Sequence, residues 1–180
     1  MGWENNMGAI KHSGQRVAVL LDVQNLYHSA KNLYQARVNF GAILKASIAN
    51  RNLIRAFGYV VKTKTGEEKA FFEALTKLGI ETRVRDLQEF FGGQKKADWD
   101  VGITVDAIRI AASVDVIVLG SGDGDFIQLV EYLKNQGKRV EVIAFGKATS
   151  ARLKEVVDEV IDLCDYPSKY LLKKNEKRNI

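Results

Sequence analysis

Cysteine and histidine, the residues that form disulfides and structural zinc sites, are scarce in this chain of 180 residues. Cys164 is the only cysteine, which excludes an intramolecular disulfide framework. His12 and His28 are the only histidines, so we do not expect a structural zinc site. Since a cysteine-poor chain without disulfides suits a reducing compartment, we expect a cytoplasmic protein.

Long hydrophobic runs are also absent. No segment approaches the roughly 18 consecutive apolar residues that a membrane-spanning helix requires, and the N-terminal segment lacks the apolar stretch of a secretory signal peptide. We therefore expect no membrane association and no secretion. Apolar residues make up 46% of the chain and charged residues 27%, values typical of a globular domain. The length predicts one such domain.

The body of the chain has almost no excess of one charge. The whole sequence has 27 Lys and Arg against 22 Asp and Glu, a net charge of +5. Most of this excess lies in residues 166–180, which contain five basic residues and one acidic residue. We predict a flexible arm over residues 1–15, a globular domain over 16–165 and a basic tail over 166–180. Such a tail can contact nucleic-acid phosphates, although a solvated terminus is the commoner case.

The sequence does contain a regular alternation of short apolar runs and amphipathic segments. The apolar runs predict strands at 16–21, 53–61, 80–84, 115–119, 139–144 and 160–163. The amphipathic segments predict helices at 25–34, 40–49, 66–78, 99–112, 125–136 and 150–157. Residues 86–97 are predicted to form a loop. Strands that alternate with helices indicate right-handed βαβ units, and thus an α/β fold with a mainly parallel sheet of five or six strands.

Polar residues gather directly after the predicted strands. In an open α/β sheet, ligands bind at this place, the carboxyl ends of the strands. Three segments supply the polar residues: Asp22 and Asn25 after the first strand, Asp98 and Asp100 at the start of the 99–112 helix, and Ser121, Asp123 and Asp125 after the fourth strand. If the first and fourth strands are neighbours, four or five carboxylates share one cleft.

Carboxylates that crowd together repel one another, which raises the pKa of one or more of them unless a cation lies among them. A cluster of oxygen ligands without cysteine suits a hard ion such as Mg²⁺ or Mn²⁺. Such an ion can activate a water molecule and stabilise the leaving oxygen in phosphodiester cleavage. The acids therefore favour a metal-dependent hydrolase.

Most of these acids also have a purely structural interpretation. Asp22 can cap the helix that follows it, and Asp100 can be a first-turn acid that the helix dipole favours. Asp106 stands three residues before Arg109, and we prefer a surface salt bridge for this pair. In the segment GSGDGDF one aspartate suffices for a cap, so two aspartates flanked by three glycines favour a functional loop.

Other motifs with acids or glycines in similar positions do not fit. A dinucleotide-binding fingerprint that starts at Gly120 needs a glycine where Asp125 stands. A calcium-binding EF-hand loop that starts at Asp123 needs an acid where Lys134 stands. A phosphate-receiver domain would use Lys147 after the fifth strand, but the end of the third strand offers no well-placed phosphoacceptor.

Three stretches together resemble the LabA-like branch of the NYN family, within the PIN-like nuclease superfamily. They are VAVLLDVQNLY at 17–27, KADWDVGITVDA at 96–107 and VIVLGSGDGDF at 116–126. With weaker matches nearer the C-terminus, the resemblance spans about residues 16–163. It implies a Rossmann-like three-layer α/β/α fold with strand order 3-2-1-4-5, and it implies that the globular domain is a metal-dependent ribonuclease.

The resemblance also assigns roles to individual residues. It implies that Mg²⁺ or Mn²⁺ is bound by four acids, Asp22, Asp100, Asp123 and Asp125. Asn25 and Ser121 complete the catalytic set by hydrogen-bonding the ligating carboxylates. Asp106 matches a further acid that is frequent in the family, while Asp98 has weaker support.

RNA is the partner that the resemblance implies. Basic side chains near the predicted strand ends would contact its phosphates, namely Lys95, Lys96, Lys147 and Arg152. The adjacent Phe90 and Phe91 can stack on bases, although a buried position for one of them is the commoner arrangement. The main alternative is a non-catalytic RNA- or protein-binding module with a structural metal site. The sequence leaves the oligomeric state open, a homodimer included.

Overall fold

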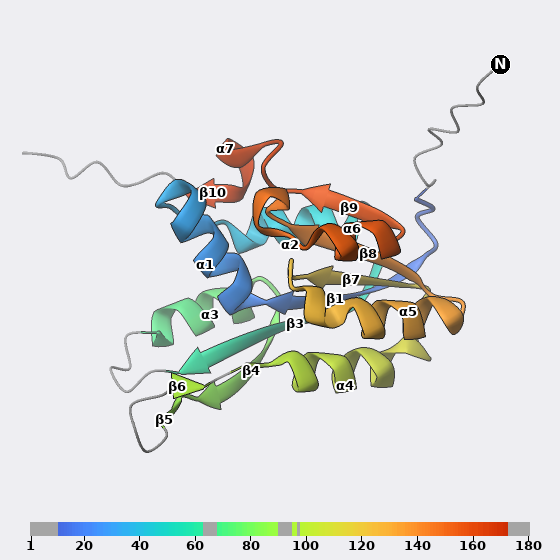
Figure 1. Cartoon of the computed structure of the whole chain (residues 1–180), viewed down its shortest axis with the longest axis horizontal. Coiled ribbons are helices and arrows are strands. Elements are labelled where there is room, and N and C mark those ends of the chain that lie inside the picture. Colours follow the sequence, from blue (N-terminus) through green and yellow to red (C-terminus); the bar gives the residue numbers. More distant parts are fainter. Residues whose placement is uncertain (1–10, 63–67, 90–94, 97, 173–180) are drawn as a thin grey trace, which may run out of the picture.

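The computed structural model describes residues 11–62, 68–89, 95, 96 and 98–172, and a parallel sheet of six strands lies at its centre (Figure 1). The sheet contains β1 (Arg16–Asp22), β3 (Asn52–Lys62), β4 (Glu81–Asp86), β7 (Val116–Gly120), β8 (Arg139–Ala144) and β9 (Glu159–Asp162). The strand order is β4-β3-β1-β7-β8-β9, and every neighbouring pair is parallel. The predicted order 3-2-1-4-5 is confirmed, and the sixth predicted strand is added beside the fifth.

Helices cover both faces of this sheet and complete three layers (Figure 1). One face carries α1 (Val23–Tyr34), α2 (Phe40–Ile48) and α3 (Lys69–Lys77). The other face carries α4 (Asp100–Ala111), α5 (Ile127–Asn135) and α6 (Ala151–Val156). The three-layer α/β/α fold is therefore confirmed.

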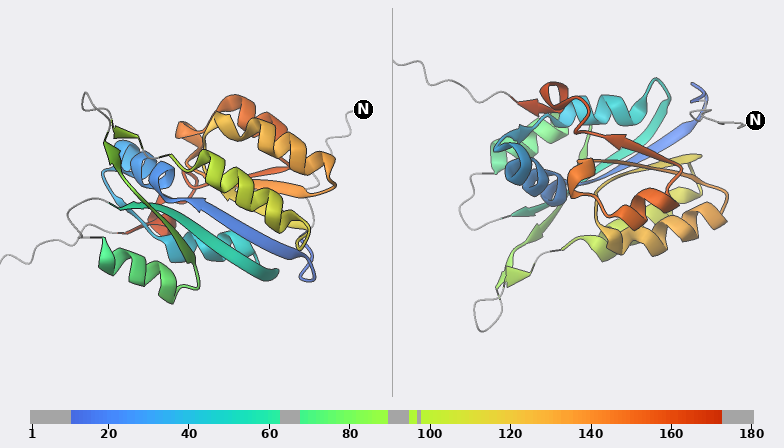
Figure 2. Two further views of the ribbon diagram at one scale, coloured as in Figure 1. Left: turned by 90° about the horizontal axis from the view of Figure 1, so that it is seen from below. Right: turned by 45° about the horizontal axis from the view of Figure 1, so that its top comes forward.

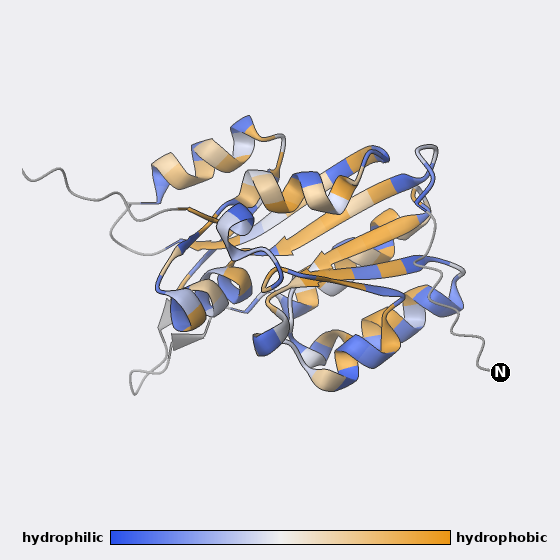
Figure 3. Cartoon of the chain, turned by 90° about the horizontal axis from the view of Figure 1, so that it is seen from above, coloured by the Kyte–Doolittle hydropathy of each residue, from blue (hydrophilic) through white to orange (hydrophobic). Residues whose placement is uncertain are grey.

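The central strand β1 explains why a continuous apolar run marks a buried parallel strand. Val17, Val19 and Leu21 pack in the core beneath α1 and α2, whereas Ala18 and Leu20 pack in the core beneath α4 and α5. All five side chains are fully buried, because a strand with helices on both faces has no polar side. Figure 3 shows the central strands as strongly hydrophobic, between helices of mixed character.

The predicted helices differ from the observed ones mainly at their ends. α1 begins two residues earlier than predicted, because Asp22 caps it by accepting a hydrogen bond from the N–H of Asn25 at 3.1 Å. The predicted 125–136 helix divides into a 3₁₀ turn, η1 (Gly124–Phe126), and α5. Among the described residues, none of the helices has the length and apolar character needed to cross a membrane.

Two short antiparallel pairs lie outside the main sheet, and neither was predicted. β5 (Gln88–Glu89) pairs with β6 (Lys95–Lys96), which corrects the prediction of a plain loop over this segment. β2 (Arg37–Val38) pairs with β10 (Leu171–Leu172). Strands of two residues are too short to carry an alternating pattern, so no hydropathy period marks them.

The residues just after the predicted domain boundary pack on the domain. α7 (Pro167–Tyr170) leads into β10, and Tyr170 is buried in the core beneath α1 and α2. The N–H of Asn39 donates a hydrogen bond to the carbonyl of Tyr170 at 2.8 Å. Parts of the predicted arm, tail and aromatic pair lie outside the described residues, namely 1–10, 173–180, Phe90 and Phe91.

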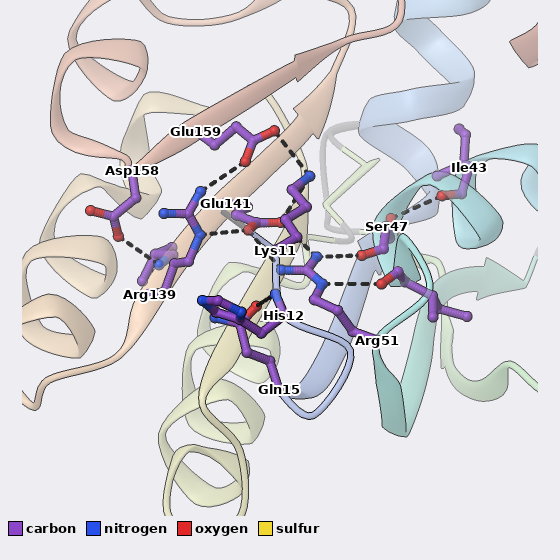
Figure 4. Close-up of polar contacts among 12 residues, drawn as sticks. Lys11, His12, Gln15, Ile43, Ser47, Arg51, Arg139, Glu141, Asp158 and Glu159 are labelled. Atoms are coloured by element: carbon purple, nitrogen blue, oxygen red, sulfur yellow. Dashed lines mark hydrogen bonds and ion pairs between the residues drawn. The ribbon is translucent and has the colours of Figure 1, made fainter. Parts of the chain in front are cut away.

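A buried ion-pair network ties the amino ends of the strands together (Figure 4). The Arg51 guanidinium donates two hydrogen bonds of 2.8 Å to the Glu141 carboxylate, and Arg139 Nε donates a third at 2.7 Å. Lys11 and Glu159 extend the network. Burial raises the pKa of Glu141, but the hydrogen bonds from the two arginines outweigh it and hold this pKa below its usual range.

Candidate metal site

The carboxyl ends of β1 and β7 lie side by side, because Leu21 of β1 pairs with Gly120 of β7. Asp22 is the last residue of β1 and is only 8% exposed. Its side chain accepts hydrogen bonds from the N–H of Asn25 at 3.1 Å and from the hydroxyl of Ser121 at 3.4 Å. The acid that ends the first strand therefore contacts the loop that follows β7.

Two polar side chains hold the backbone of this loop. The side-chain oxygen of Asn25 accepts a hydrogen bond from the N–H of Gly122 at 3.1 Å, and Ser121 Oγ accepts one from the N–H of Asp123 at 3.3 Å. The Asp123 carboxylate in turn accepts a hydrogen bond from the N–H of Asp125 at 3.0 Å. These bonds fix the segment of backbone that carries the two loop carboxylates.

Gly122 allows the loop to approach the segment between β8 and α6. A Cβ at this position would lie 2.7 Å from the hydroxyl oxygen of Thr149 and 2.9 Å from its Cα. The N–H of Ser150 also donates a hydrogen bond to the carbonyl of Gly122 at 2.9 Å. A larger residue would push the acidic loop away from this support, so the glycine is explained by close packing.

Three of the predicted acids form one group at this edge of the sheet. Carboxylate oxygens of Asp100, Asp123 and Asp125 lie within 4.8 Å of one another. Asp100 comes from the start of α4, whereas the other two come from the loop after β7. Since oxygen ligands are the ones that Mg²⁺ and Mn²⁺ prefer, this donor set fits such an ion.

Asp22 lies beside this group and is linked to it through Ser121, which also contacts the N–H of Asp123. Burial raises the pKa of Asp22 to about 6; the hydrogen bond from Asn25 lowers it, and the charges of Asp100 and Asp123 raise it. Burial and neighbouring acids thus both oppose the ionised form of this carboxyl group. A cation at this edge would stabilise that form.

Trp99 positions Asp100, a role that the sequence did not predict. Its indole N–H donates a hydrogen bond to the carbonyl of Val60 at 2.9 Å, and its ring centroid lies 5.4 Å from that of Tyr59. A Cβ on Gly102 would lie 2.6 Å from the indole. The start of α4 is thereby fixed against β3. In the sequence, the only indication of this anchor is the tryptophan directly before Asp100 in the segment KADWD.

Asp106 belongs to a separate network on α4. Its carboxylate accepts a hydrogen bond from the hydroxyl of Tyr59 at 3.0 Å. It also lies 3.7 Å from a guanidinium nitrogen of Arg109 and 3.5 Å from Arg83 Nε. The preferred salt bridge between Asp106 and Arg109 is therefore present, together with two partners from distant parts of the sequence.

The basic residues predicted to contact RNA come from two places in the fold. Lys147 lies in the turn after β8 and Arg152 lies in α6, and both are exposed. Lys95 and Lys96 form β6, whose backbone pairs with β5. Asp98, the weaker candidate, precedes α4, and its carbonyl accepts a hydrogen bond from Arg85 at 2.7 Å.

An α/β/α fold with clustered acids at the carboxyl ends of its strands is what the resemblance to the NYN family implies. Comparison with known families supports this resemblance. The family model of the NYN domain matches residues 16–164 of this chain. The chain therefore belongs to the NYN domain family, within the PIN-like nuclease superfamily, and the predicted family is confirmed.

The chain is also similar to two known proteins. It is 27% identical over 167 residues to the low amplitude and bright protein LabA of Synechococcus elongatus, a match that covers 85% of this chain and 86% of LabA. It is also similar to the crystal structure of a protein of unknown function from Vibrio parahaemolyticus. That match has a TM-score of 0.81 and 30% sequence identity, and it covers 91% of this chain and 99% of the other.

Proposed function

We propose that this protein is a metal-dependent ribonuclease that hydrolyses phosphodiester bonds in RNA. The observation that carries the proposal is the group of three carboxylates within 4.8 Å of one another, with the buried Asp22 beside it. The three clustered acids repel one another, and Asp100 and Asp123 also act on Asp22, unless a cation offsets their charge. The NYN family generally comprises nucleases, which supports the same class of reaction.

Each predicted metal ligand and catalytic residue has a role in this proposal. The ion, Mg²⁺ or Mn²⁺, would be held by the predicted ligands Asp22, Asp100, Asp123 and Asp125. When bound, such an ion makes water more acidic and stabilises negative charge on the phosphate and leaving oxygens. Asn25 and Ser121 are positioning residues, because they hydrogen-bond Asp22 and the backbone of the acidic loop.

Cleavage of a labelled single-stranded RNA by highly purified protein tests the proposal. We expect hydrolysis with Mg²⁺ or Mn²⁺ and none with EDTA. Asp123→Asn should reduce the rate by at least about 100-fold, because even residues that only support metal ligands are often worth 10–100-fold. Glu131→Gln is the matched control, since it neutralises an exposed acid on α5. Equal rates for wild type and Asp123→Asn would overturn the proposal.

A non-catalytic RNA- or protein-binding module with a structural metal site is the second candidate. The caps favour it, because Asp22 caps α1 and Asp123 caps η1, so both acids have structural partners within the chain. In this case Mn²⁺ raises the melting temperature of the wild type, yet no divalent ion supports cleavage. A purified protein that binds the ion tightly and leaves RNA intact would favour this candidate over the nuclease.

A further inference from the structure

On the face of the sheet that carries α4, the strands β3 and β4 extend beyond this helix. α4 packs on β1 and β7, and β3 and β4 run beside it in the view from below (Figure 2, left). In this part of the sheet, arginine side chains lie over the buried ring of Phe57. Arg83 and Arg85 alternate along β4 with Thr82 and Val84, so both arginines point to the same side of the strand.

Contacts show that four arginines form one surface there, which we call the arginine face: Arg55, Arg83, Arg85 and Arg109. The guanidinium carbons of Arg55 and Arg83 lie 4.5 and 5.2 Å from the centre of the Phe57 ring. Arg83 and Arg109 are joined through Asp106, at 3.5 and 3.7 Å.

The same surface reaches the candidate metal site through Arg85. Its guanidinium carbon lies 4.5 Å from the centre of the Trp99 ring, and it donates a hydrogen bond to the carbonyl of Asp98 at 2.7 Å. Trp99 is followed directly by Asp100, one of the three clustered acids. The arginine face therefore runs from β3 and β4 to the group of clustered acids.

The positive charge of this face exceeds the acids that contact it. Among the described residues, two carboxylates form ion pairs with these four guanidinium groups: Glu81 pairs with Arg55 at 2.6 Å, and Asp106 is shared by Arg83 and Arg109. The 3.5 Å contact of Arg83 is longer than the roughly 2.7–2.9 Å of a strong charged hydrogen bond. The Arg109 side chain is 76% exposed, so its pairing is weak. The guanidinium groups of Arg83 and Arg109 can therefore exchange these weak contacts for a stronger anionic partner.

We propose that the arginine face binds the phosphates of single-stranded RNA that leads into the candidate metal site. The choice of RNA as the ligand rests on the proposed function. Arginines two residues apart on a strand lie ~6.6 Å apart, a separation close to that of successive phosphates in an extended strand. The planar guanidinium group binds phosphate through two parallel hydrogen bonds. An unpaired base can stack on Arg85, whose guanidinium group already lies on Trp99.

The competing explanation is that the arginines only seal the sheet. Arg55 and Arg83 cover the ring of Phe57, and Arg85 covers the ring of Trp99, which shields both rings from water. A sealing role requires the aliphatic stems and flat groups of these side chains and no nucleic acid. Binding measurements separate the two explanations, because only the RNA-binding role predicts a loss of affinity.

The test is the fluorescence anisotropy of a labelled oligouridylate of about 12 nucleotides, measured in EDTA so that metal-dependent cleavage does not occur. We expect the double variant Arg85→Ala/Arg109→Ala to bind about tenfold more weakly, with a salt dependence reduced by roughly 1.4 in log–log slope. The matched control is Lys45→Ala/Lys77→Ala, which removes the same charge from exposed positions on α2 and α3, on the opposite face. This control should bind as the wild type does.

Several results would overturn the inference. They are an unchanged affinity of the arginine variant, an equal loss in the lysine control, or no binding of the oligonucleotide by the wild type. Arg85→Lys/Arg109→Lys should recover only part of the affinity, because lysine restores the charge but not the two parallel hydrogen bonds of the guanidinium group. Thermal melts that match the wild type show that each variant is folded.

The outcomes also keep this inference apart from the proposed nuclease activity. If Asp123→Asn abolishes cleavage while the Arg85→Ala/Arg109→Ala variant binds and cleaves RNA normally, the nuclease stands and the arginine face is not its RNA-binding surface. If binding depends on these arginines and no divalent ion supports cleavage, the RNA-binding face stands and the nuclease proposal fails.

Discussion

Two buried carboxylates, one near the amino ends of the strands and one at the carboxyl ends, have opposite electrostatic surroundings. Glu141, near the amino ends of the strands, is 0% exposed and accepts three hydrogen bonds from Arg51 and Arg139. Asp22, at the carboxyl end of β1, is 8% exposed and is influenced by the charges of Asp100 and Asp123. The pKa of Glu141 is lowered, whereas that of Asp22 is raised to about 6.

Burial alone therefore does not decide how an acid behaves in this fold. The arginines that surround Glu141 supply its counter-charge from within the chain, so the loss of one of them would leave a buried charge without compensation. The neighbours that shift the pKa of Asp22 are hydrogen-bond donors and further acids. The comparison indicates that the charge of Glu141 is already compensated within the chain, whereas a cation would stabilise the ionised form of Asp22.

Arg51→Ala should give the largest loss of stability. This change leaves the Glu141 carboxylate buried without its main partner, and breaking a buried ion pair from one side costs about 3–5 kcal/mol. The same guanidinium also donates hydrogen bonds to the carbonyls of Ser47 and Ile48, which would be lost with it. Chemical denaturation of the metal-free protein measures the change in the free energy of unfolding.

An exposed ion pair provides the control for this prediction. Arg16 pairs with Asp115 at 2.7 Å near the same edge, but both side chains are largely in contact with water. Arg16→Ala should therefore lower the free energy of unfolding far less than Arg51→Ala does. Equal losses for Arg16→Ala and Arg51→Ala would show that burial does not distinguish the two pairs.

A divalent ion bound by the acids at the carboxyl ends of the strands should give the next largest change in the free energy of unfolding. Mn²⁺ at about 100 times its dissociation constant raises the free energy of unfolding by ~2.7 kcal/mol if it binds the folded state alone. Asp123→Asn should remove most of this gain, whereas Glu131→Gln should keep it. Thermal melts with and without EDTA measure the effect, and an equal gain in both variants would place the ion elsewhere.

The sequence allows the acidic edge to be predicted because its determinants are local. The fully apolar run at 17–21 indicates a strand buried on both faces, and Asp22 follows it directly. The glycine-rich loop at 120–126 follows another such strand. Once these two strands are placed side by side, the acids that follow them come together. The resemblance to the NYN family supplied the strand order that this step needs.

The rest of the molecule depends on contacts between residues far apart in the sequence. Arg51 and Glu141 are separated by 90 positions, and the only local indication of their pairing is a glutamate within the apolar strand 139–144. The arginine face requires the register of β4 on β3 and the position of α4. The anchoring role of Trp99 depends on the carbonyl of Val60. No hydropathy period encodes such contacts.

Asp22→Asn should stabilise the metal-free protein at pH 7 by about 1 kcal/mol, because it removes a charge whose pKa is raised by burial. Asparagine is also a good N-cap residue, so the cap on α1 is retained. The same variant should bind Mn²⁺ more weakly, which a calorimetric titration measures. A clear loss of stability without metal would mean that Asp22 acts mainly through its structural hydrogen bonds.

The smallest effect that we expect is on the pH dependence of stability, to which Asp22 and Glu141 should contribute with opposite signs. The pKa of Asp22 is raised from 3.8 to about 6, so its contribution to stability is fully present below 3.8 and is lost as the pH rises through 6. The pKa of Glu141 is lowered, so its contribution is present above the unfolded pKa of about 4.3 and is lost as the pH falls below it.

Denaturation of the metal-free wild type, Asp22→Asn and Glu141→Gln at several pH values measures this contrast. Between pH 7 and 5 the advantage of Asp22→Asn over the wild type should shrink by roughly 1 kcal/mol, because the wild-type carboxyl group takes up its proton in the folded state. The deficit of Glu141→Gln should stay nearly constant over this range and shrink only below about pH 4.3. Parallel pH profiles for the two variants would remove the distinction between the two edges of the sheet.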